Sequence, residues 1–254
     1  MESYDLLLCL LFAAMALLYA SVGHAGSSGY QASMAIMGLS AAVMKPTALC
    51  LNLVVASIAT LQFARSGYIQ WKVWLWLVIA SVPAAYLGGY FVLPQGWYYV
   101  LVALVLWTAA LKLWFSASTS PSHLISEYQS MSPYLAVFVG AGLGFLSGLT
   151  GTGGGIFLTP LLVLGHWANP RQAAGLSAAF ILANSPAALL GWWQQQGTRV
   201  ELPALLPLWM VLVAVFGWLG AWYGSRRGSP LLLRRLLALV LVIAGAKMVL
   251  SVLK

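Results

Sequence analysis

A run of glycine interrupts a segment that otherwise has the composition of a membrane-embedded helix. Glycine occupies positions 151, 153, 154 and 155, between the apolar stretches 133–149 and 156–165. Lipid offers no hydrogen-bond partners, so non-helical backbone survives at that depth only where protein buries it or where it lines a wet cavity. Broken helices of this kind form the solute sites of transporters. The glycine run therefore predicts a solute site within the membrane.

The composition indicates a membrane protein. Of 254 residues, 62% are hydrophobic and 6% are charged, whereas a soluble domain carries roughly 25% charged residues. Seven apolar runs can cross a hydrocarbon core: 6–22, 47–64, 73–93, 97–115, 133–149, 202–223 and 236–253. We expect an all-α, multi-pass protein of the bacterial-type cytoplasmic (inner) membrane, with roughly eight to ten transmembrane or half-membrane helices.

The charges exclude several functions. The net charge of +8 does not indicate a nucleic-acid partner, because the basic residues lie mostly singly or in pairs at span ends, where they report topology. Glu2, Asp5, Glu127 and Glu201 lie at the termini, in a polar linker or at a span end. No carboxylate is therefore expected inside the membrane, which disfavours cation transport. No metal or other cofactor is expected, and no enzyme signature is present.

The chain divides at the polar stretch 116–132, which we expect to link a first transmembrane repeat (1–115) to a second (133–254). Similar patterns recur at an offset of 125 that drifts to 135, and residues 23–30 pair with 148–155. Each repeat has one span, a small-residue interruption, a short apolar segment and three further spans. The short segments, 33–43 and 156–165, either complete a broken helix or form a re-entrant hairpin.

The distribution of basic residues favours inverted repeats. If every segment crosses, seven basic residues lie inside and three outside, as the positive-inside rule requires. An odd number of crossings per repeat inverts the second repeat and brings two matching broken helices together near the midplane. If the short segments do not cross, the repeats are parallel. We expect the inverted arrangement.

The two interruptions carry the candidate donors for an anion. Amides of Gly153, Gly154 and Gly155 would lie at the start of a helix, whose dipole favours negative charge. Hydroxyl groups of serine, threonine and tyrosine can add hydrogen bonds to an oxyanion. The alternative is close helix packing through small residues. The candidate substrate-binding residues are Gly23, His24, Gly26, Ser27, Ser28, Gly29, Tyr30, Asn52, Thr150, Gly151, Thr152, Gly153, Gly154, Gly155, Ser177 and Asn184.

Two positions in this part of the sequence have competing interpretations. His24 is the histidine that lies inside an apolar region; it either tunes charge and passes a proton, or it is a neutral side chain bonded to a backbone carbonyl. Lys45 and Pro46 open one span as Pro170 and Arg171 open another. The basic residue either attracts an anion at a cavity mouth or extends its charge to the membrane surface, and the second interpretation is favoured.

The tandem pattern resembles the TauE/SafE family of sulfite exporters and their relatives. The stretch 150–155, followed by Thr159, Pro160, Leu161 and Leu162, looks like the glycine-rich signature of that family and its downstream proline and leucine. In the first repeat, Gly23, His24, Ser28, Gly29 and Tyr30 resemble a subgroup with histidine and hydroxyl groups in place of glycines. The resemblance spans nearly the whole chain. It implies outward transport of a small sulfur-containing anion, such as sulfite or an organosulfonate.

We therefore expect a secondary transporter whose partners are a small anionic solute and the lipid bilayer. Proton coupling and homo-oligomer formation are compatible with the sequence. Three alternatives stay open: an anion channel, an intramembrane hydrolase that uses His24 with Ser27 or Ser28, and a structural subunit that binds no solute.

Overall fold

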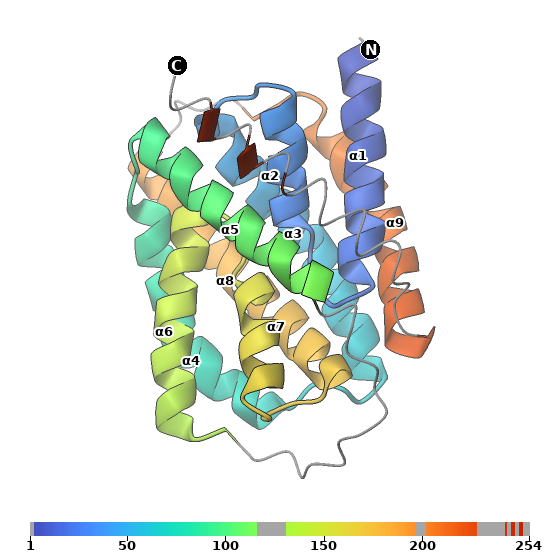
Figure 1. The fold of residues 1–254 in the computed structure, drawn as a ribbon, viewed down its shortest axis with the longest axis vertical. Coiled ribbons are helices and arrows are strands. Elements are labelled where there is room, and N and C mark those ends of the chain that lie inside the picture. Colours follow the sequence, from blue (N-terminus) through green and yellow to red (C-terminus); the bar gives the residue numbers. More distant parts are fainter. Residues whose placement is uncertain are drawn as a thin grey trace.

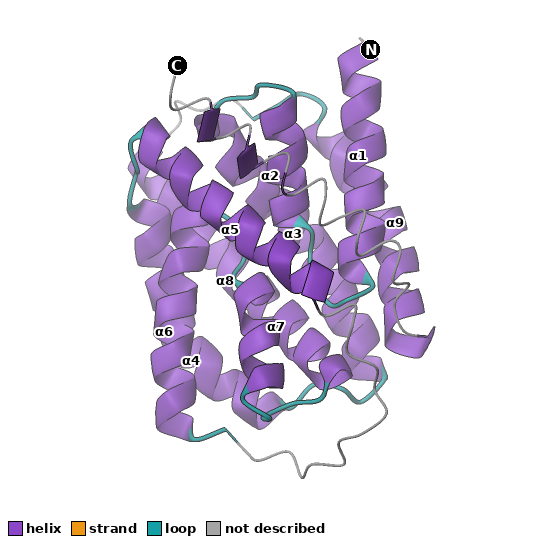
Figure 2. Ribbon diagram, in the orientation of Figure 1, coloured by secondary structure: helices purple, strands orange, loops and turns teal. Residues whose placement is uncertain are grey.

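The computed structural model describes residues 3–115, 131–196 and 202–227, together with positions 242, 245, 246, 249 and 250. In this part of the chain the regular structure is entirely helical (Figures 1 and 2), which confirms the all-α class. The helices are α1 (Ser3–Ala20), α2 (Ser27–Ile36), α3 (Ala41–Arg65), α4 (Trp71–Tyr90), α5 (Gln95–Phe115), α6 (Pro133–Thr150), α7 (Gly155–Leu164), α8 (Pro170–Gln196) and α9 (Leu206–Arg227).

Five of these helices, α3, α4, α6, α8 and α9, are long and apolar enough to cross a membrane. The helices α2 and α7 have ten residues each, about half a crossing at helical rise. Six of the predicted apolar runs match α1, α3, α4, α5, α6 and α9 to within a few residues, except that α3 begins six residues before its run. Helix α8 corresponds to none of the predicted runs. Most of the predicted linker and of the last apolar run lies outside the described residues.

The first short segment was predicted wrongly. Helix α2 covers Ser27–Ile36 rather than 33–43, so residues 27–30 form its first turn and are not part of an irregular loop. Residues 27–35 are all buried in the protein. Because these residues contact protein rather than lipid, they need not be apolar. A search for apolar runs therefore does not detect the helix. The second short segment, α7, begins one residue before the predicted position.

Two breaks separate consecutive helices. The first break (residues 21–26) lies between α1 and α2, and the second break (residues 151–154) lies between α6 and α7. Gly23 and Gly26 have φ of 76° and 97°, and Gly151 and Gly154 have φ of 74° and 76°. Glycine adopts this left-handed region at little cost. Two left-handed glycines of each break thus correspond at an offset of 128 residues rather than the predicted 125, whereas Gly153, with φ of 77°, has no left-handed counterpart in the first break.

The packing of the helices is reciprocal between the predicted repeats. Helix α1, the first of the N-terminal repeat, packs against α9, the fourth of the C-terminal repeat, and α6 packs in the same way against α4. Helices α3 and α8 pack against each other between these pairs. The duplication of the chain itself stays a prediction.

Glycine brings α6 and α4 into backbone contact. A Cβ atom added at any of three α6 glycines, spaced four residues apart, would lie 2.1–2.3 Å from a carbonyl oxygen of α4. The pairs are Gly140 with Leu77, Gly144 with Ser81, and Gly148 with Ala85. Small residues allow helices in membranes to approach in this way. The contact fixes the end of α6, and hence the start of the second break, against α4.

Candidate solute site at the two helix breaks

The start of α2, directly after the first break, is in contact with the second break and the end of α6. Ser27 Oγ, in the first turn of α2, donates a hydrogen bond of 2.6 Å to the carbonyl oxygen of Thr152 in the second break. Gln31 Nε2, one turn further along α2, donates 2.7 Å to the carbonyl oxygen of Thr150. Helix α5 runs across the front of the bundle between α2 and α7 and contacts both (Figure 1). The motifs that the sequence singled out are therefore assembled into one buried region.

The hydroxyl groups of Thr150, Thr152 and Ser28 are engaged within the protein. Thr150 Oγ1 donates to the carbonyl oxygen of Leu146 at 2.8 Å, and Thr152 Oγ1 lies 2.8 Å from Thr150 Oγ1. Because Thr150 has one hydroxyl proton, Thr152 is the donor in the second bond. Ser28 Oγ donates to the hydroxyl group of Tyr19 at 2.8 Å. These groups fasten the breaks, and their use as donors to a solute stays a prediction.

His24 connects the first break to α7. Its Nε2 lies 3.1 Å from the carbonyl oxygen of Gly155 and 3.1 Å from Thr159 Oγ1. A carbonyl oxygen can only accept, so the contact with Gly155 places a proton on Nε2. Thr159 Oγ1 in turn lies 2.7 Å from Ser177 Oγ on α8. The carbonyl contact expected of a structural histidine is thus present, and a role in proton transfer stays a prediction.

Thr159 is a polar contact that the sequence analysis did not include among the site residues. It follows Gly155 by four residues, which places both on the same face of α7. The sequence signal that could have identified Thr159 is its position, a hydroxyl residue one helical turn beyond the glycine run.

Asn52 is the polar side chain with the most unused hydrogen-bonding capacity in this region. It is completely buried in α3, and neither its Nδ2 nor its Oδ1 atom has a partner among the described residues. A Cβ atom at Gly153 would lie 2.9 Å from Asn52 Nδ2, so the amide faces the second break. Leaving a buried polar group unpaired costs roughly 1–3 kcal/mol. A role of this amide in binding a solute stays a prediction.

Three other candidate residues are placed differently. The Tyr30 hydroxyl group is buried without a partner, and a Cβ atom at Gly26 would lie 2.8 Å from it. Gly29 faces α1, where a Cβ atom would lie 2.7 Å from Met15 Sδ. Asn184 donates to the carbonyl oxygen of Phe180 at 2.9 Å, while its Oδ1 lacks a partner. It lies on α8, two helical turns beyond Ser177.

Lys45 is buried in the protein and bonded to another helix rather than extended into water, so the favoured interpretation of its position was wrong. It is buried, with 6% of its surface exposed, and its Nζ donates to the carbonyl oxygens of Gly89 (3.2 Å) and Gly88 (3.4 Å). These carbonyls belong to the last turn of α4. A cation at that end of a helix is favourable because the terminal carbonyls have no helical partners. Pro46 also lies inside α3 rather than at its start.

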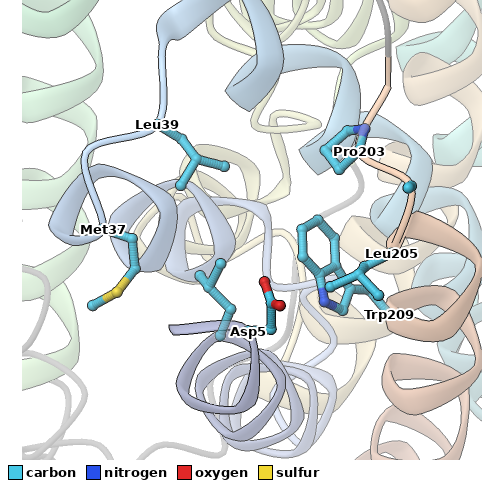
Figure 3. A pocket seen from close by; sticks show the side chains of 8 residues that line it. Asp5, Met37, Leu39, Pro203, Leu205 and Trp209 are labelled. Carbon is cyan, nitrogen blue, oxygen red and sulfur yellow. The ribbon is translucent and has the colours of Figure 1, made fainter. Parts of the chain in front are cut away.

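A separate pocket opens where the start of α1 meets two loops (Figure 3). It encloses about 380 Å³ and is lined by Asp5, Leu8, Met37, Leu39, Pro203, Ala204, Leu205 and Trp209. The indole ring of Trp209 packs edge-on against Phe12, which packs edge-on against Tyr30. One carboxylate and otherwise mainly apolar side chains do not suit an anion. The pocket is therefore not the predicted solute site.

Comparison with known proteins identifies the family. The profile described as "Sulfite exporter TauE/SafE" matches residues 7–248. A Sinorhizobium fredii protein named "Probable membrane transporter protein y4hK" is 38% identical over 248 residues, which cover 98% of this chain and 99% of that protein. A "Probable membrane transporter protein" of Xylella fastidiosa is 37% identical over 116 residues, or 41% of this chain and 39% of that protein. No solved structure matches the chain. The chain therefore belongs to the TauE/SafE family of membrane transporters.

Proposed function

We propose that the protein is a secondary transporter that exports a small sulfur-containing anion across the bacterial cytoplasmic membrane. Sulfite and organosulfonates are the substrate class that the family name supports. The observation that carries the proposal is the contact between the start of α2 and the second break, made by Ser27 and Thr152 on the side of the break that also faces the unpaired amide of Asn52. Irregular backbone at one place in two broken helices is the architecture of a transporter solute site.

The electrostatics of the breaks favour an anion. Helices α2 and α7 both begin at a left-handed glycine, Gly26 and Gly154, and neither start is capped by a side-chain hydrogen bond. The first amides of a helix have no intrahelical partner and lie at the positive end of its dipole. Among the described residues the acidic side chain is that of Asp5, which lines the separate pocket. A cation would find no carboxylate in this part of the protein.

The arrangement of the helices supports inverted repeats. In Figure 1, α1 begins at the top of the bundle and descends, whereas α6 begins at the bottom and rises. Each of these helices packs against the fourth helix of the other repeat. An inverted pair of repeats exposes one central site alternately to the two sides of the membrane, which is how secondary transporters operate. If transport is coupled to protons, His24 is the group that carries the proton, since imidazole changes charge near neutral pH.

The contacts of the two serines argue against a hydrolase. Ser27 donates its hydroxyl proton to the carbonyl oxygen of Thr152, and Ser28 donates to Tyr19. A serine nucleophile needs to donate to its general base, which would be His24. The geometry therefore supports binding and transport rather than covalent catalysis.

Flux in liposomes tests the proposal. Purified protein is reconstituted into vesicles loaded with radiolabelled sulfite or methanesulfonate, and efflux is followed with and without a pH gradient, with protein-free vesicles as the control. We expect saturable efflux of at least one of these anions and none of a monovalent cation such as rubidium. Efflux equal to that of protein-free vesicles for every sulfur anion tested would overturn the proposal.

A further inference from the structure

Lys45 and Asn52 lie seven residues apart on α3, about two helical turns, and therefore share one face of that helix. Both border the second break. A Cβ atom at Gly151 would lie 3.0 Å from Lys45 Cγ, and one at Gly153 would lie 2.9 Å from Asn52 Nδ2. The glycines of the second break thus run along α3 between the stem of a lysine and a buried amide.

The ammonium group of Lys45 is held beside the end of α6. Its partners, the carbonyl groups of Gly88 and Gly89, belong to the part of α4 that touches α6. A Cβ atom at Gly148 would lie 2.6 Å from the Gly89 nitrogen, and the second break begins three residues after Gly148. Lys45 is therefore linked to the second break in two ways: its stem borders Gly151, and its ammonium group bonds to the part of α4 that holds the end of α6.

No carboxylate neutralises this charge among the residues that the structure describes. The hydrogen-bond partners of the ammonium group are two neutral carbonyl oxygens, and Asp5 lines the separate pocket with Trp209. Carbonyl groups stabilise an ammonium ion but do not cancel its charge. A buried ion without a counter-ion is unfavourable, and such residues within membranes mark the paths of ions.

We propose that Lys45 is the charge-compensating residue of an anion site at the second break, an inference that rests on the proposed function. The anion binds against the face of α3 between Lys45 and Asn52. The Asn52 amide donates a hydrogen bond to one oxygen of the anion. The backbone amides at the start of α7 donate hydrogen bonds to its other oxygens. Lys45 makes the site prefer an anion over a neutral molecule of the same shape.

Two substitutions separate this role from that of a helix cap. Lys45→Gln keeps amide donors for the carbonyls of Gly88 and Gly89 but removes the charge, and Lys45→Arg keeps the charge. The assay is inhibition of radiolabelled sulfite flux by methanesulfonate, an anion, and by dimethyl sulfone, a neutral molecule of similar shape. Size-exclusion chromatography gives the amount of folded protein, to which flux is normalised.

In the wild type we expect inhibition by methanesulfonate and none by dimethyl sulfone. In Lys45→Gln, the KM for sulfite and the inhibitory concentration of methanesulfonate should each rise about tenfold or more, as expected for loss of a charged partner. Lys45→Arg, which keeps the charge, should have a KM for sulfite and an inhibitory concentration of methanesulfonate close to those of the wild type. A lysine that only caps α4 would change the folded yield and leave KM and the preference for the anion unchanged.

An isosteric variant keeps the proposal testable if Lys45→Gln does not fold. Asn52→Asp leaves the ammonium group of Lys45 bonded to the carbonyls of α4 and adds a negative charge to the face of α3 that both residues share. It should abolish the preference for methanesulfonate over dimethyl sulfone. Folded Lys45→Gln or Asn52→Asp protein with wild-type KM and preference would overturn the role of Lys45. Absence of sulfur-anion flux in the wild type would instead overturn the proposed function, and with it this inference.

Discussion

Ser27 Oγ donates to the carbonyl oxygen of Thr152 at 2.6 Å, and this bond joins residues that are 125 positions apart. Both residues are buried. The hydroxyl group belongs to the first turn of α2, and the carbonyl group belongs to the second break. The first turn of α2 therefore supplies a polar partner that the irregular backbone of the second break requires.

Ser27→Ala should weaken this junction. The substitution leaves the buried carbonyl group of Thr152 without its donor, which costs roughly 1–3 kcal/mol. We expect a lower melting temperature in detergent and a reduced rate of sulfite flux per folded molecule. Ser57→Ala is the matched control, because Ser57 is exposed and its hydroxyl group bonds only to the carbonyl oxygen of Leu53 in its own helix. The control should behave as the wild type; equal losses in both variants would contradict a specific role for Ser27.

Gly154→Leu should abolish transport while the protein stays in the membrane. Gly154 has φ of 76°, a conformation that leucine adopts at a cost of roughly 1–2 kcal/mol. Its Cβ atom would also lie 2.9 Å from the Phe180 ring. Gly142→Leu on α6 is the control, since a Cβ atom there has no neighbour within 4 Å. Flux per inserted molecule is the measurement, and normal flux in Gly154→Leu would remove the second break from the site.

Gly144→Ala should affect folding rather than solute binding. A Cβ atom at Gly144 would lie 2.3 Å from the carbonyl oxygen of Ser81, so α4 and α6 would have to separate. We expect a marked loss of folded protein in thermal size-exclusion assays, with KM for sulfite unchanged in the molecules that fold. Gly142→Ala again serves for comparison. A variant with normal stability and altered KM would show that the α4–α6 contact belongs to the solute site.

Asn52→Leu should impair solute binding without lowering stability, the reverse of the effect expected for Gly144→Ala. Leucine has nearly the same shape and removes a buried amide that has no partner, so the melting temperature should stay the same or rise. The KM for sulfite should rise about tenfold, because the solute loses a hydrogen bond in a buried site. A fall in stability together with unchanged KM would indicate a structural amide.

His24→Gln tests proton coupling. Glutamine can donate to the Gly155 carbonyl group as His24 Nε2 does, but it cannot be protonated near neutral pH. If His24 carries the proton, the acceleration of sulfite flux by a pH gradient should disappear while flux at equal pH falls less. Gradient-driven flux that falls in the same proportion as flux at equal pH would assign His24 a structural role.

Local sequence predicted the spans and both breaks because lipid imposes strong constraints on composition. Apolar runs indicate the helices, and the glycines of the second break indicate where the backbone leaves helical geometry. The start of α2 was missed because Ser27 and Gln31 face protein rather than lipid, so hydropathy does not reveal the helix. The offset between the breaks was also missed, because it depends on backbone conformation at Gly23 and Gly151 and not on residue identity.

Contacts between distant segments were the least predictable part of the site. The burial of Lys45 depends on its reaching the end of α4, more than forty residues away in the chain. The hydrogen bonds of Ser27 to the second break and of His24 to the start of α7 likewise depend on tertiary packing. The sequence could identify these side chains as polar residues in or beside apolar segments. It could not show that their polar atoms are engaged, or that those of Asn52 are unpaired.

The packing of α1 against α9, a helix far away in the chain, has a consequence for biosynthesis. Helix α1 emerges from the ribosome before its packing partner α9, because all the other described helices lie between them in the chain. Until then, α1 has no α9 surface to pack against, and the glycines of α9 that fit against it have not yet entered the bilayer. Release of a chain truncated before residue 206 should therefore leave a species that the quality-control proteases of the membrane degrade, since its first helix cannot reach its native position.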